Sequence, residues 1–549
     1  MKTISFSGFR EQIGLILAGL FFLISAVFAI CNHWNSSSGI SRENTVELVF
    51  AHWQLEDGFR EGIDHAIREY EKAKAAQGIR VKVRQMAIPV RGYPQWMMTQ
   101  LLSGKPADIM ELRGSSNLLS QHFVPLSPYI TRPNPWNENS PLRGTSWQES
   151  FSDNMLASLD PIYSEYYGAA LFIFTTRLFV NMELYREVCG TDRLPGTVSE
   201  WIDACKKMRL YGKKAGKPII PIGVRGFDKA TLQQLLYVYN SQICATLMED
   251  ASPYGNSQSA SEIFRQINAG TLDKARILAP LELVCELGQY FADGFSAIDL
   301  EQTKYLFSQG NVAFFVDGTY NAWSLVNNSP FEVQVARIPV LDSKHPLGQQ
   351  AVDISEQGYG VSGTFGITRK SEYRELALDF LQFLSSWKIN QEIIVGSCKW
   401  MSSLKKVRYS GLMEKLVPAT DAEYRPVPLF FNTGPKTNRA MIAALEQCII
   451  RPRHDLRSYL WNDFLACRPL VLEELRASRE AALKNLSEQE AIRSVLAVFR
   501  NFMSPDEEQK KLAEMRAGSN LEAVVGRIRI LDENLLLEQE LSQLQEAAE

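Results

Sequence analysis

Short apolar runs alternate with helix-type segments along most of this chain. The first run, Val46 to Ala51, has the character of a buried strand, and it ends in His52 and Trp53. A segment with helical spacing of apolar residues follows from about Gly58 to Gln77, and a second strand is predicted at Ile79 to Arg84. This order of strand, helix and strand predicts a mainly parallel sheet covered by helices.

The same alternation continues beyond these elements. The pattern predicts a helix at about Pro94 to Leu102, a strand at Ala107 to Met110, a helix capped by Thr197 that runs to about Leu210, a strand at Pro218 to Val224, helices at about 228–249, 259–268 and 275–292, a strand at Val361 to Ile367 and an amphipathic helix at Glu372 to Ser386. Residues 132–150 are rich in Pro, Asn and Trp, which predicts a surface excursion.

Beyond Arg468 the composition shifts to Glu, Leu, Arg and Lys, which predicts a helical tail. Within it, Val524, Ile528, Leu531 and Leu535 form one apolar stripe. The stripe is too short to specify a coiled coil, which needs roughly three or four heptads. A helical extension packed on its own domain is the alternative.

The segment from Phe307 to Trp323, FSQGNVAFFVDGTYNAW, combines a strand, a sharp turn and the start of a helix. Asn311 to Val316 is the strand-type run, the turn falls at Asp317-Gly318, and the helix opens around Thr319. In open α/β sheets, ligands bind where strands end and helices begin, because free backbone N–H groups point into that crevice. An indole in the first turns of this helix is well placed to stack on a flat ligand face. The simpler alternative is a core position for Trp323.

Composition and charge narrow the function classes. The chain has 549 residues, 45% hydrophobic and 10% aromatic, which is enough for roughly two to four domains. Its 58 basic and 62 acidic residues give a net charge of −4, so no long-range field steers it onto nucleic acid or an anionic membrane. We therefore expect no nucleic-acid partner.

The start of the chain is strongly apolar. Ile13 to Cys31 comprises 19 uncharged and mostly apolar residues, as in an export signal or a single membrane anchor. Cleavage after Ala29 is one alternative, and lipid attachment at Cys31 is another, although Ile30 is bulkier than such signals favour. In each case the chain beyond residue 35 lies in a periplasmic or extracytoplasmic location, either free or held at the inner membrane by residues 13–31.

Motifs of catalysis and metal binding are missing from the sequence. There is no G-x-S-x-G, no H-E-x-x-H and no complete Walker loop, and the 6 histidines have no metal-ligand spacing. The 8 cysteines include no C-x-x-C pair, which argues against a zinc ribbon or a thioredoxin-type site. Most are expected to be small buried hydrophobes, with a bridge between Cys189 and Cys205 as one alternative. We predict no cofactor, no metal and no catalytic residue.

Five segments occur in a recognisable order. They are ELVFAHW at 47–53, LLSGKPADIMEL at 101–112, RLFVNMELYREVCGTDRLPGTVSEWIDACKKM at 177–208, FSQGNVAFFVDGTYNAW at 307–323 and GYGVSGTFGITRKSEYRELALDFLQFLSS at 358–386. Together they resemble family 1 of the extracellular solute-binding proteins, the carbohydrate ABC-transporter proteins that include maltose-binding protein. The resemblance spans about residues 46–405.

This resemblance implies an α/β fold of the type II periplasmic-binding-protein class, in which two lobes enclose a ligand cleft. The implied organisation is a signal or anchor at 1–31, a linker at 32–44, lobe 1 at 45–165 and 360–405, lobe 2 at 168–355 and 410–465, and a helical C-terminal extension at 468–549. The implied partners are a sugar or related small molecule and the permease subunits of an ABC transporter.

Carried over residue by residue, the resemblance implies a set of substrate-binding candidates. They are His52, Trp53, Glu111, Arg113, Asp317, Trp323, Tyr359 and Trp400. Aromatic rings can cover the C–H faces of a sugar, and carboxylate, guanidinium and imidazole groups can pair with its hydroxyls. Each candidate also has a structural alternative, and Glu111 and Arg113 can equally form an ion pair with one another.

Two other classes of function remain open at this stage. The tail beyond residue 468 has no counterpart in the compact family fold, so the protein can also be a membrane-tethered solute receptor or an envelope interaction protein. An exported glycoside hydrolase would also carry aromatics and paired carboxylates, such as Asp160 with Glu165 or Glu111 with Asp317. Because acidic residues are common, such pairs arise by chance, and we predict that the chain is not an enzyme.

Overall fold

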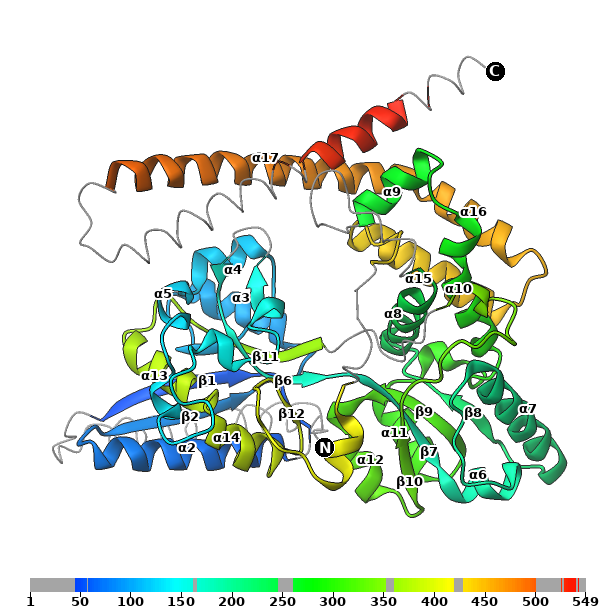
Figure 1. Cartoon of the computed structure of the whole chain (residues 1–549), viewed down its shortest axis with the longest axis horizontal. Helices are drawn as coiled ribbons and strands as arrows, with labels where there is room; N and C mark the ends of the chain where they lie inside the picture. Colours follow the sequence, from blue (N-terminus) through cyan, green and yellow to red (C-terminus); the bar gives the residue numbers. More distant parts are fainter. Residues whose placement is uncertain are drawn as a thin grey trace, which may run out of the picture. The chain divides into compact units, whose positions relative to one another are not determined.

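The structure is a computed structural model, and it describes residues 45–56, 58–160, 165–244, 260–351, 360–418, 428–499, 525, 528–539 and 542 (Figure 1). The predicted signal or anchor and the linker lie outside these residues. None of the helices in the described part is long and apolar enough to cross a membrane.

The chain divides into two compact units. Residues 1–47 and 71–82 form one, in which the Val46 N–H donates to the Arg80 carbonyl at 3.0 Å. Residues 48–70 and 83–549 form the other, which holds the cavities discussed below.

A six-stranded sheet has the strand order β12-β6-β11-β3-β1-β2. Its strands are β1 (Val46–His52), β2 (Val81–Ala87), β3 (Ile109–Glu111), β6 (Ala169–Phe174), β11 (Gly360–Ile367) and β12 (Met401–Ser402). Strand β1 runs parallel to β3, whereas β11 is antiparallel to both β3 and β6. The sheet is therefore mixed, and the prediction of a mainly parallel sheet is wrong because β6, β11 and β12 do not belong to the local strand–helix–strand order.

A four-stranded sheet has the order β10-β7-β9-β8. Its strands are β7 (Thr176–Asn181), β8 (Ile220–Gly223), β9 (Val312–Gly318) and β10 (Val333–Ala336). Strand β9 pairs in parallel with β8 and antiparallel with β7. Since β8 and β9 point the same way, the residues that follow them meet at one edge of this sheet.

Helices account for most of the remaining described residues. They are α2 (Phe59–Ala76), α3 (Tyr93–Ser103), α4 (Ser116–His122), α5 (Ser127–Ile130), α6 (Met182–Cys189), α7 (Val198–Ala215), α8 (Ala230–Cys244), α9 (Ala260–Asn268), α10 (Lys274–Gly288), α11 (Leu300–Ser308), α12 (Ala322–Asn328), α13 (Arg374–Leu384), α14 (Trp387–Ile389), α15 (Pro435–Ile450), α16 (Leu456–Ala466) and α17 (Arg468–Phe499). Thr197 caps α7, as predicted, because its hydroxyl accepts the Glu200 N–H at 3.3 Å.

A single residue, Thr175, separates β6 of the first sheet from β7 of the second. Its carbonyl accepts the Thr319 N–H at 2.9 Å, which ties this crossing to the chain that leaves β9. The next charged residue, Arg177, is wholly buried, and its guanidinium donates to the carbonyls of Leu416 at 3.2 Å and Val417 at 2.8 Å. A buried cation that is satisfied by carbonyls in this way holds the segment after β12 against β7.

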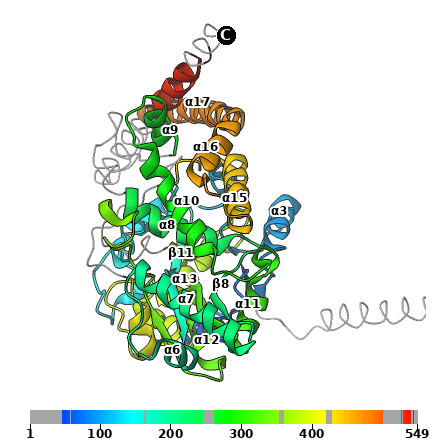
Figure 2. The same ribbon diagram turned by 90° about the vertical axis from the view of Figure 1, so that its right-hand side faces the viewer.

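The largest hydrophobic core surrounds the four-stranded sheet and extends into the C-terminal helices. Helices α15 and α16 pack on α10 (Figure 2), and Phe464 of α16 lies in the same cluster as Phe314 of β9. Leu531 of the predicted tail stripe is wholly buried in this core as well. The tail residues that surround Leu531, 528–539, therefore pack on their own chain.

The excursion predicted at 132–150 is anchored by its aromatic residues. Trp147 is wholly buried and donates from Nε1 to the Ser385 hydroxyl at 2.8 Å, and Trp136 donates to Asp379 at 3.0 Å. Many residues of this segment are exposed, as predicted, whereas Trp147 is buried and Trp136 is half-buried. Pro and Asn specify an irregular backbone but do not specify exposure, whereas an indole gains by burial.

Candidate functional site

A cavity of about 680 Å³ is lined by residues that follow strands of both sheets. The six-stranded sheet and its connections contribute Trp53, Gln54, Leu55, Glu56, Val90, Phe172, Ile173, Phe174, Ser362, Trp400 and Met401. The elements of the four-stranded sheet contribute Arg225, Ala230, Gln233, Gln234, Tyr237, Leu300, Glu301, Lys304, Thr319, Tyr320 and Asn321. The volume lies within the range of roughly 300–1,000 Å³ that is usual for small-molecule sites.

Two indoles in the cavity wall are fixed by neighbouring rings. The Trp400 ring packs edge-on against Phe172 with 4.2 Å between centroids, and only 4% of Trp400 is exposed. Trp53 packs edge-on against Tyr93 at 4.9 Å, and the Arg113 guanidinium carbon lies 5.7 Å from its ring centroid. Because this packing restricts both rings, the wall is largely preorganised for a ligand.

Arg225, which follows β8, connects the charged groups on the other side of the cavity. It donates to the Tyr320 hydroxyl at 2.7 Å and to Asp228 at 2.6 Å, and it pairs with Asp317 at 3.3 Å. Asp317 is the penultimate residue of β9, is wholly buried and also accepts from the Asn321 amide at 2.7 Å. Burial raises the pKa of Asp317, and the Arg225 charge acts in the opposite direction.

A second polar group lies behind Trp53. Glu111 is wholly buried, and it accepts hydrogen bonds from the Trp53 N–H at 3.2 Å and from the Gln54 side-chain amide. Burial raises the pKa of Glu111 to about 8, against the effect of these hydrogen bonds. The Tyr93 hydroxyl donates to the Glu111 carbonyl at 2.8 Å. These bonds position the loop that carries Trp53.

His52 supports the same loop. Its Nδ1 accepts the Gln54 N–H at 3.1 Å, so in the neutral ring Nε2 carries the proton and donates to Gln85 at 2.8 Å. Burial lowers the pKa of His52 to about 4, which keeps the ring neutral at physiological pH.

Two buried polar atoms in the cavity wall have no hydrogen-bond partner among the residues that the structure describes. They are Nε of Arg225, a donor, and Oε1 of Gln234, an acceptor. Leaving such a group unsatisfied costs about 1–3 kcal/mol. Both atoms are buried within the wall, so a ligand hydroxyl reaches them only after these side chains shift. The lining as a whole still offers donors and acceptors, such as Gln233, Glu301 and Lys304, that suit a polyhydroxylated molecule.

The structure separates the eight sequence-predicted candidates into groups. Trp53 and Trp400 line the cavity. His52, Glu111 and Asp317 are buried behind its wall, and Arg113 lies over Trp53. Trp323 is 39% exposed outside the lining, with Lys399 Nζ 4.9 Å from its ring centroid, and Tyr359 lies outside the described residues.

The carboxylate pairs considered for hydrolysis do not face the cavity. Asp160 and Glu165 are cross-strand partners in a small hairpin of β4 (Leu159–Asp160) and β5 (Glu165–Tyr166). Glu111 and Asp317 are each held by their own hydrogen-bond partners behind the wall. Within the described residues, no group of three or more His, Cys, Asp or Glu side chains is placed to hold a metal ion.

Sequence reasoning missed most of the polar lining. Two of these residues had a signal: Arg225 follows a predicted strand, and Tyr320 lies in the motif from Phe307 to Trp323. Gln234 and Tyr237 had none. They lie inside α8, and the sequence does not specify which turn of a helix borders a cavity.

Comparisons with known proteins agree with one another on the fold. A family model described as bacterial extracellular solute-binding protein matches residues 53–389. No curated protein sequence matches the chain.

Solved structures share the fold at low sequence identity. One of them comes from work on xylan utilization by Caldanaerobius polysaccharolyticus and has 14% identity and a TM-score of 0.54. The match covers 77% of this chain and 100% of that structure. The solute receptor AcbH, described as preferring β-D-galactopyranose, has 11% identity and a TM-score of 0.55, covering 78% and 100%. A protein from Thermotoga lettingae TMO bound with α-D-tagatose has 14% identity and a TM-score of 0.54, also covering 78% and 100%. The predicted α/β fold of the type II class is thereby confirmed.

Proposed function

Because the chain belongs to the family of bacterial extracellular solute-binding proteins, we propose that it binds a sugar or oligosaccharide in the 680 Å³ cavity and delivers it to the permease of an ABC transporter. Its family is one of solute-binding proteins, which confirms the prediction that the chain is not an enzyme. In this proposal the binding lobes are residues 45–165 with 360–405 and residues 168–355 with 410–465.

One observation carries the assignment to a sugar: the cavity combines indoles with many hydrogen-bonding side chains. The rings of Trp53 and Trp400 line it and provide apolar surface for sugar C–H groups. Gln233, Glu301 and Lys304 lie in the same lining and offer the donors and acceptors that sugar hydroxyls need. The sugars named for AcbH and for the Thermotoga lettingae protein support the same class of ligand.

The proposed mechanism is closure around the solute. Contacts from both sheets to one ligand favour the closed form, and a change from mostly open to mostly closed requires about 5.5 kcal/mol of differential binding. Two stacked indoles and several hydrogen bonds supply energy of this order. The proposed location is extracytoplasmic, with residues 13–31 as the export signal or membrane anchor.

Calorimetry on the full chain tests the proposal. The detergent-purified protein is titrated with a panel of monosaccharides and oligosaccharides, and each bound sugar is then recovered and analysed by chromatography. We expect saturable binding of at least one sugar, recovered intact, and at least tenfold weaker binding by Gln234→Leu. Hydrolysis of the sugar, or no binding across the panel, contradicts the proposal.

A second function, that of a tethered receptor with its own protein partner, is favoured by the size of the chain. The solved structures above are covered almost completely, yet they cover only 77–78% of this chain. Helices α15 to α17 pack together and on α10, so a partner bound to them contacts the same body that lines the cavity. If this is correct, recovery of a membrane partner from cells depends on residues 468–549 and changes with the bound sugar.

A further inference from the structure

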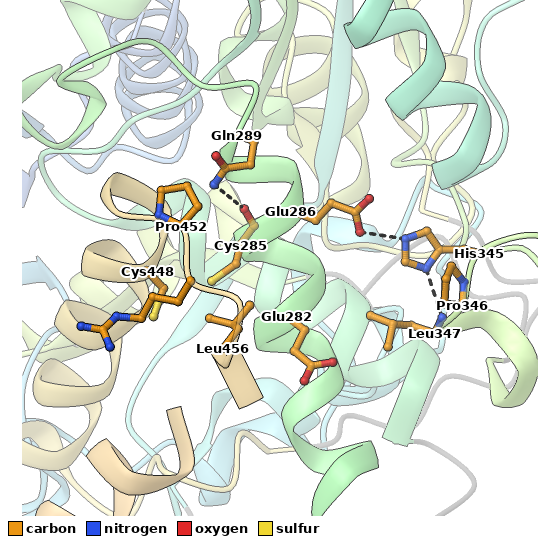
Figure 3. A pocket seen from close by; sticks show the side chains of 11 residues that line it. Glu282, Cys285, Glu286, Gln289, His345, Pro346, Leu347, Cys448, Pro452 and Leu456 are labelled. Atoms are coloured by element: carbon orange, nitrogen blue, oxygen red, sulfur yellow. Dashed lines mark hydrogen bonds and ion pairs between the residues drawn. The ribbon is translucent and has the colours of Figure 1, made fainter. Parts of the chain in front are cut away.

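A second cavity, of about 360 Å³, lies apart from the proposed sugar site (Figure 3). It is lined by Glu282, Cys285, Glu286, Gln289, His345, Pro346, Leu347, Cys448, Pro452, Arg453 and Leu456. Its walls are α10, α15 and the segments 345–347 and 452–456. The rim is held by His345, which contacts Glu286 at 2.9 Å and accepts the Leu347 N–H at 3.2 Å.

Two thiols meet at this cavity. Cys285 of α10 is 3% exposed and Cys448 of α15 is 2% exposed, and both line the cavity. Their side chains extend toward one another at the cavity wall in Figure 3. Both cysteines are free in the structure. The pair is therefore a reduced dithiol between two helices that are far apart in the sequence.

The helices approach closely where the thiols meet. A Cβ added at Gly288, one turn after Cys285, would lie 2.7 Å from side-chain atoms of Ile449, so only glycine fits there. Gln289 donates from Nε2 to the Cys285 carbonyl at 3.2 Å and to the Ile449 carbonyl at 3.4 Å. This bridge fixes the register of α10 and α15. A disulfide needs short and specific separations, and a close, fixed helix pair provides them.

The two thiols differ in the direction of their pKa shifts. The neighbouring Cys285 thiol lowers the pKa of Cys448, with the Arg453 charge acting in the same direction, while the pKa of Cys285 is raised. By contrast, burial raises the pKa of Cys205 and Cys244. The thiolate is the attacking form in thiol–disulfide exchange, so Cys448 is suited to attack and Cys285 to resolve.

We propose that Cys285 and Cys448 form a reversible disulfide that staples α15 to α10 in the extracytoplasmic compartment. The oxidant is the disulfide of a small thiol or of a thiol–disulfide oxidoreductase. Cys448 attacks one sulfur of this disulfide and releases the first donor thiol. Cys285 then loses its proton, attacks the Cys448 sulfur of the mixed disulfide and releases the second. Two electrons and two protons pass to the donor, and one intramolecular S–S bond forms.

This inference goes beyond the proposed sugar binding and does not depend on it. The disulfide joins a helix of the core around the four-stranded sheet to the C-terminal helices, which are otherwise held there by packing, by the hydrogen bond from Gln289 to Ile449 and by the ion pair of Arg457 with Glu282 at 2.6 Å. By constraining the unfolded chain, it raises stability. Because the disulfide can be reduced again, the attachment of α15 to α10 depends on the redox state of the two cysteines.

Peptide mapping of the full chain tests the proposal. The purified protein is incubated with oxidised glutathione, blocked with N-ethylmaleimide, digested without reductant and analysed by mass spectrometry. We expect one linked peptide pair that contains Cys285 and Cys448. The melting temperature of the oxidised form is expected to exceed that of the reduced form by several degrees. Cys448→Ser should abolish this shift, whereas Cys467→Ser, on the neighbouring helix end, should retain it.

The proposal is overturned if both thiols carry N-ethylmaleimide after oxidation, or if the linked peptides contain another pair such as Cys189 and Cys205. It is also overturned if Cys448→Ser keeps the difference in melting temperature. Should Cys448→Ser fail to fold, Cys285→Ala takes its place, and the peptide map of the unaltered chain decides the pairing in either case.

Discussion

Replacing Glu111 by Gln is expected to change how the stability of this protein depends on pH. The Glu111 carboxylate is wholly buried behind the cavity wall, and burial raises its pKa to about 8 from an ordinary value of 4.5. Between these values the folded protein binds a proton that the unfolded chain has already released. The free energy of unfolding therefore falls as pH rises, by about 1.4 kcal/mol per pH unit.

The size of the effect follows from the same two values. Below pH 4.5 Glu111 is protonated in both the folded and the unfolded state, so its titration costs no stability. Above pH 8 the carboxyl is ionised in both states, and the full loss of stability is present. The interval corresponds to roughly 5 kcal/mol. Glu111→Gln removes this loss. Trp53 and Gln54 donate to different carboxylate oxygens, however, and the amide nitrogen that replaces one of them cannot accept, so the variant loses about 1–3 kcal/mol at low pH. The variant is thus less stable at pH 5 and more stable at pH 9.

Urea denaturation of the full chain, followed by tryptophan fluorescence at unit steps from pH 5 to pH 9, measures this difference. The stability curves of the wild type and Glu111→Gln are expected to cross between pH 5 and pH 9. Glu414→Gln, at an exposed position, serves as the matched control and should follow the wild type. Parallel curves for the wild type and Glu111→Gln refute the reasoning, because they mean that Glu111 does not titrate in this range.

Three further predictions follow from the site. Trp53→Ala should weaken sugar binding about tenfold in calorimetry, which equals about 1.4 kcal/mol. Trp323→Ala, outside the cavity lining, should change the binding constant less than twofold. Equal effects of the two substitutions contradict the assignment of Trp53 to the site. Arg225→Met should lower the free energy of unfolding by about 3–5 kcal/mol, because the buried Asp317 loses its cation. Adding Asp317→Asn should restore part of the lost stability. If the double variant is no more stable than Arg225→Met, the pairing is contradicted. His52 has an ordinary pKa of 6.5 and a folded pKa of about 4, so its stabilising contribution is complete above pH 6.5 and is lost as pH falls to 4. His52→Gln should remove this dependence in urea denaturation, and an unchanged slope argues against it.

The expectation that ligand-binding residues lie where strands end was useful where the strand itself could be recognised from a local apolar run. Trp53 directly follows β1, and Asp317 is the penultimate residue of β9, so the apolar runs before them marked both positions in the sequence. The rule failed to distinguish Trp323 from Tyr320. These residues lie three positions apart in one motif, yet only Tyr320 lines the cavity. Tyr320 lies in the short turn Thr319–Asn321 and Trp323 lies in α12, so the direction of each side chain depends on how these two elements join and pack.

Other parts of the site had no sequence signal. Gln234 contributes an unpaired acceptor because one turn of α8 borders the cavity. Cys285 and Cys448 line one cavity, whereas the alternative considered in the sequence was a bridge between Cys189 and Cys205, which are both free in the structure. Contacts between residues so far apart are set by helix packing, which the spacing of cysteines does not record.

By itself, the sequence determined the order of strands and helices and the family, because apolar spacing and ordered motifs are local properties of the chain. Only the tertiary structure decided which side chains meet. Arg225 and Asp317 are neighbours because β8 pairs in parallel with β9, which brings the ends of two distant strands to one edge. The order of the strands depends on the burial of whole faces of the sheets, and no single segment of the sequence determines that burial. The chemistry of the cavity therefore depends on the tertiary structure.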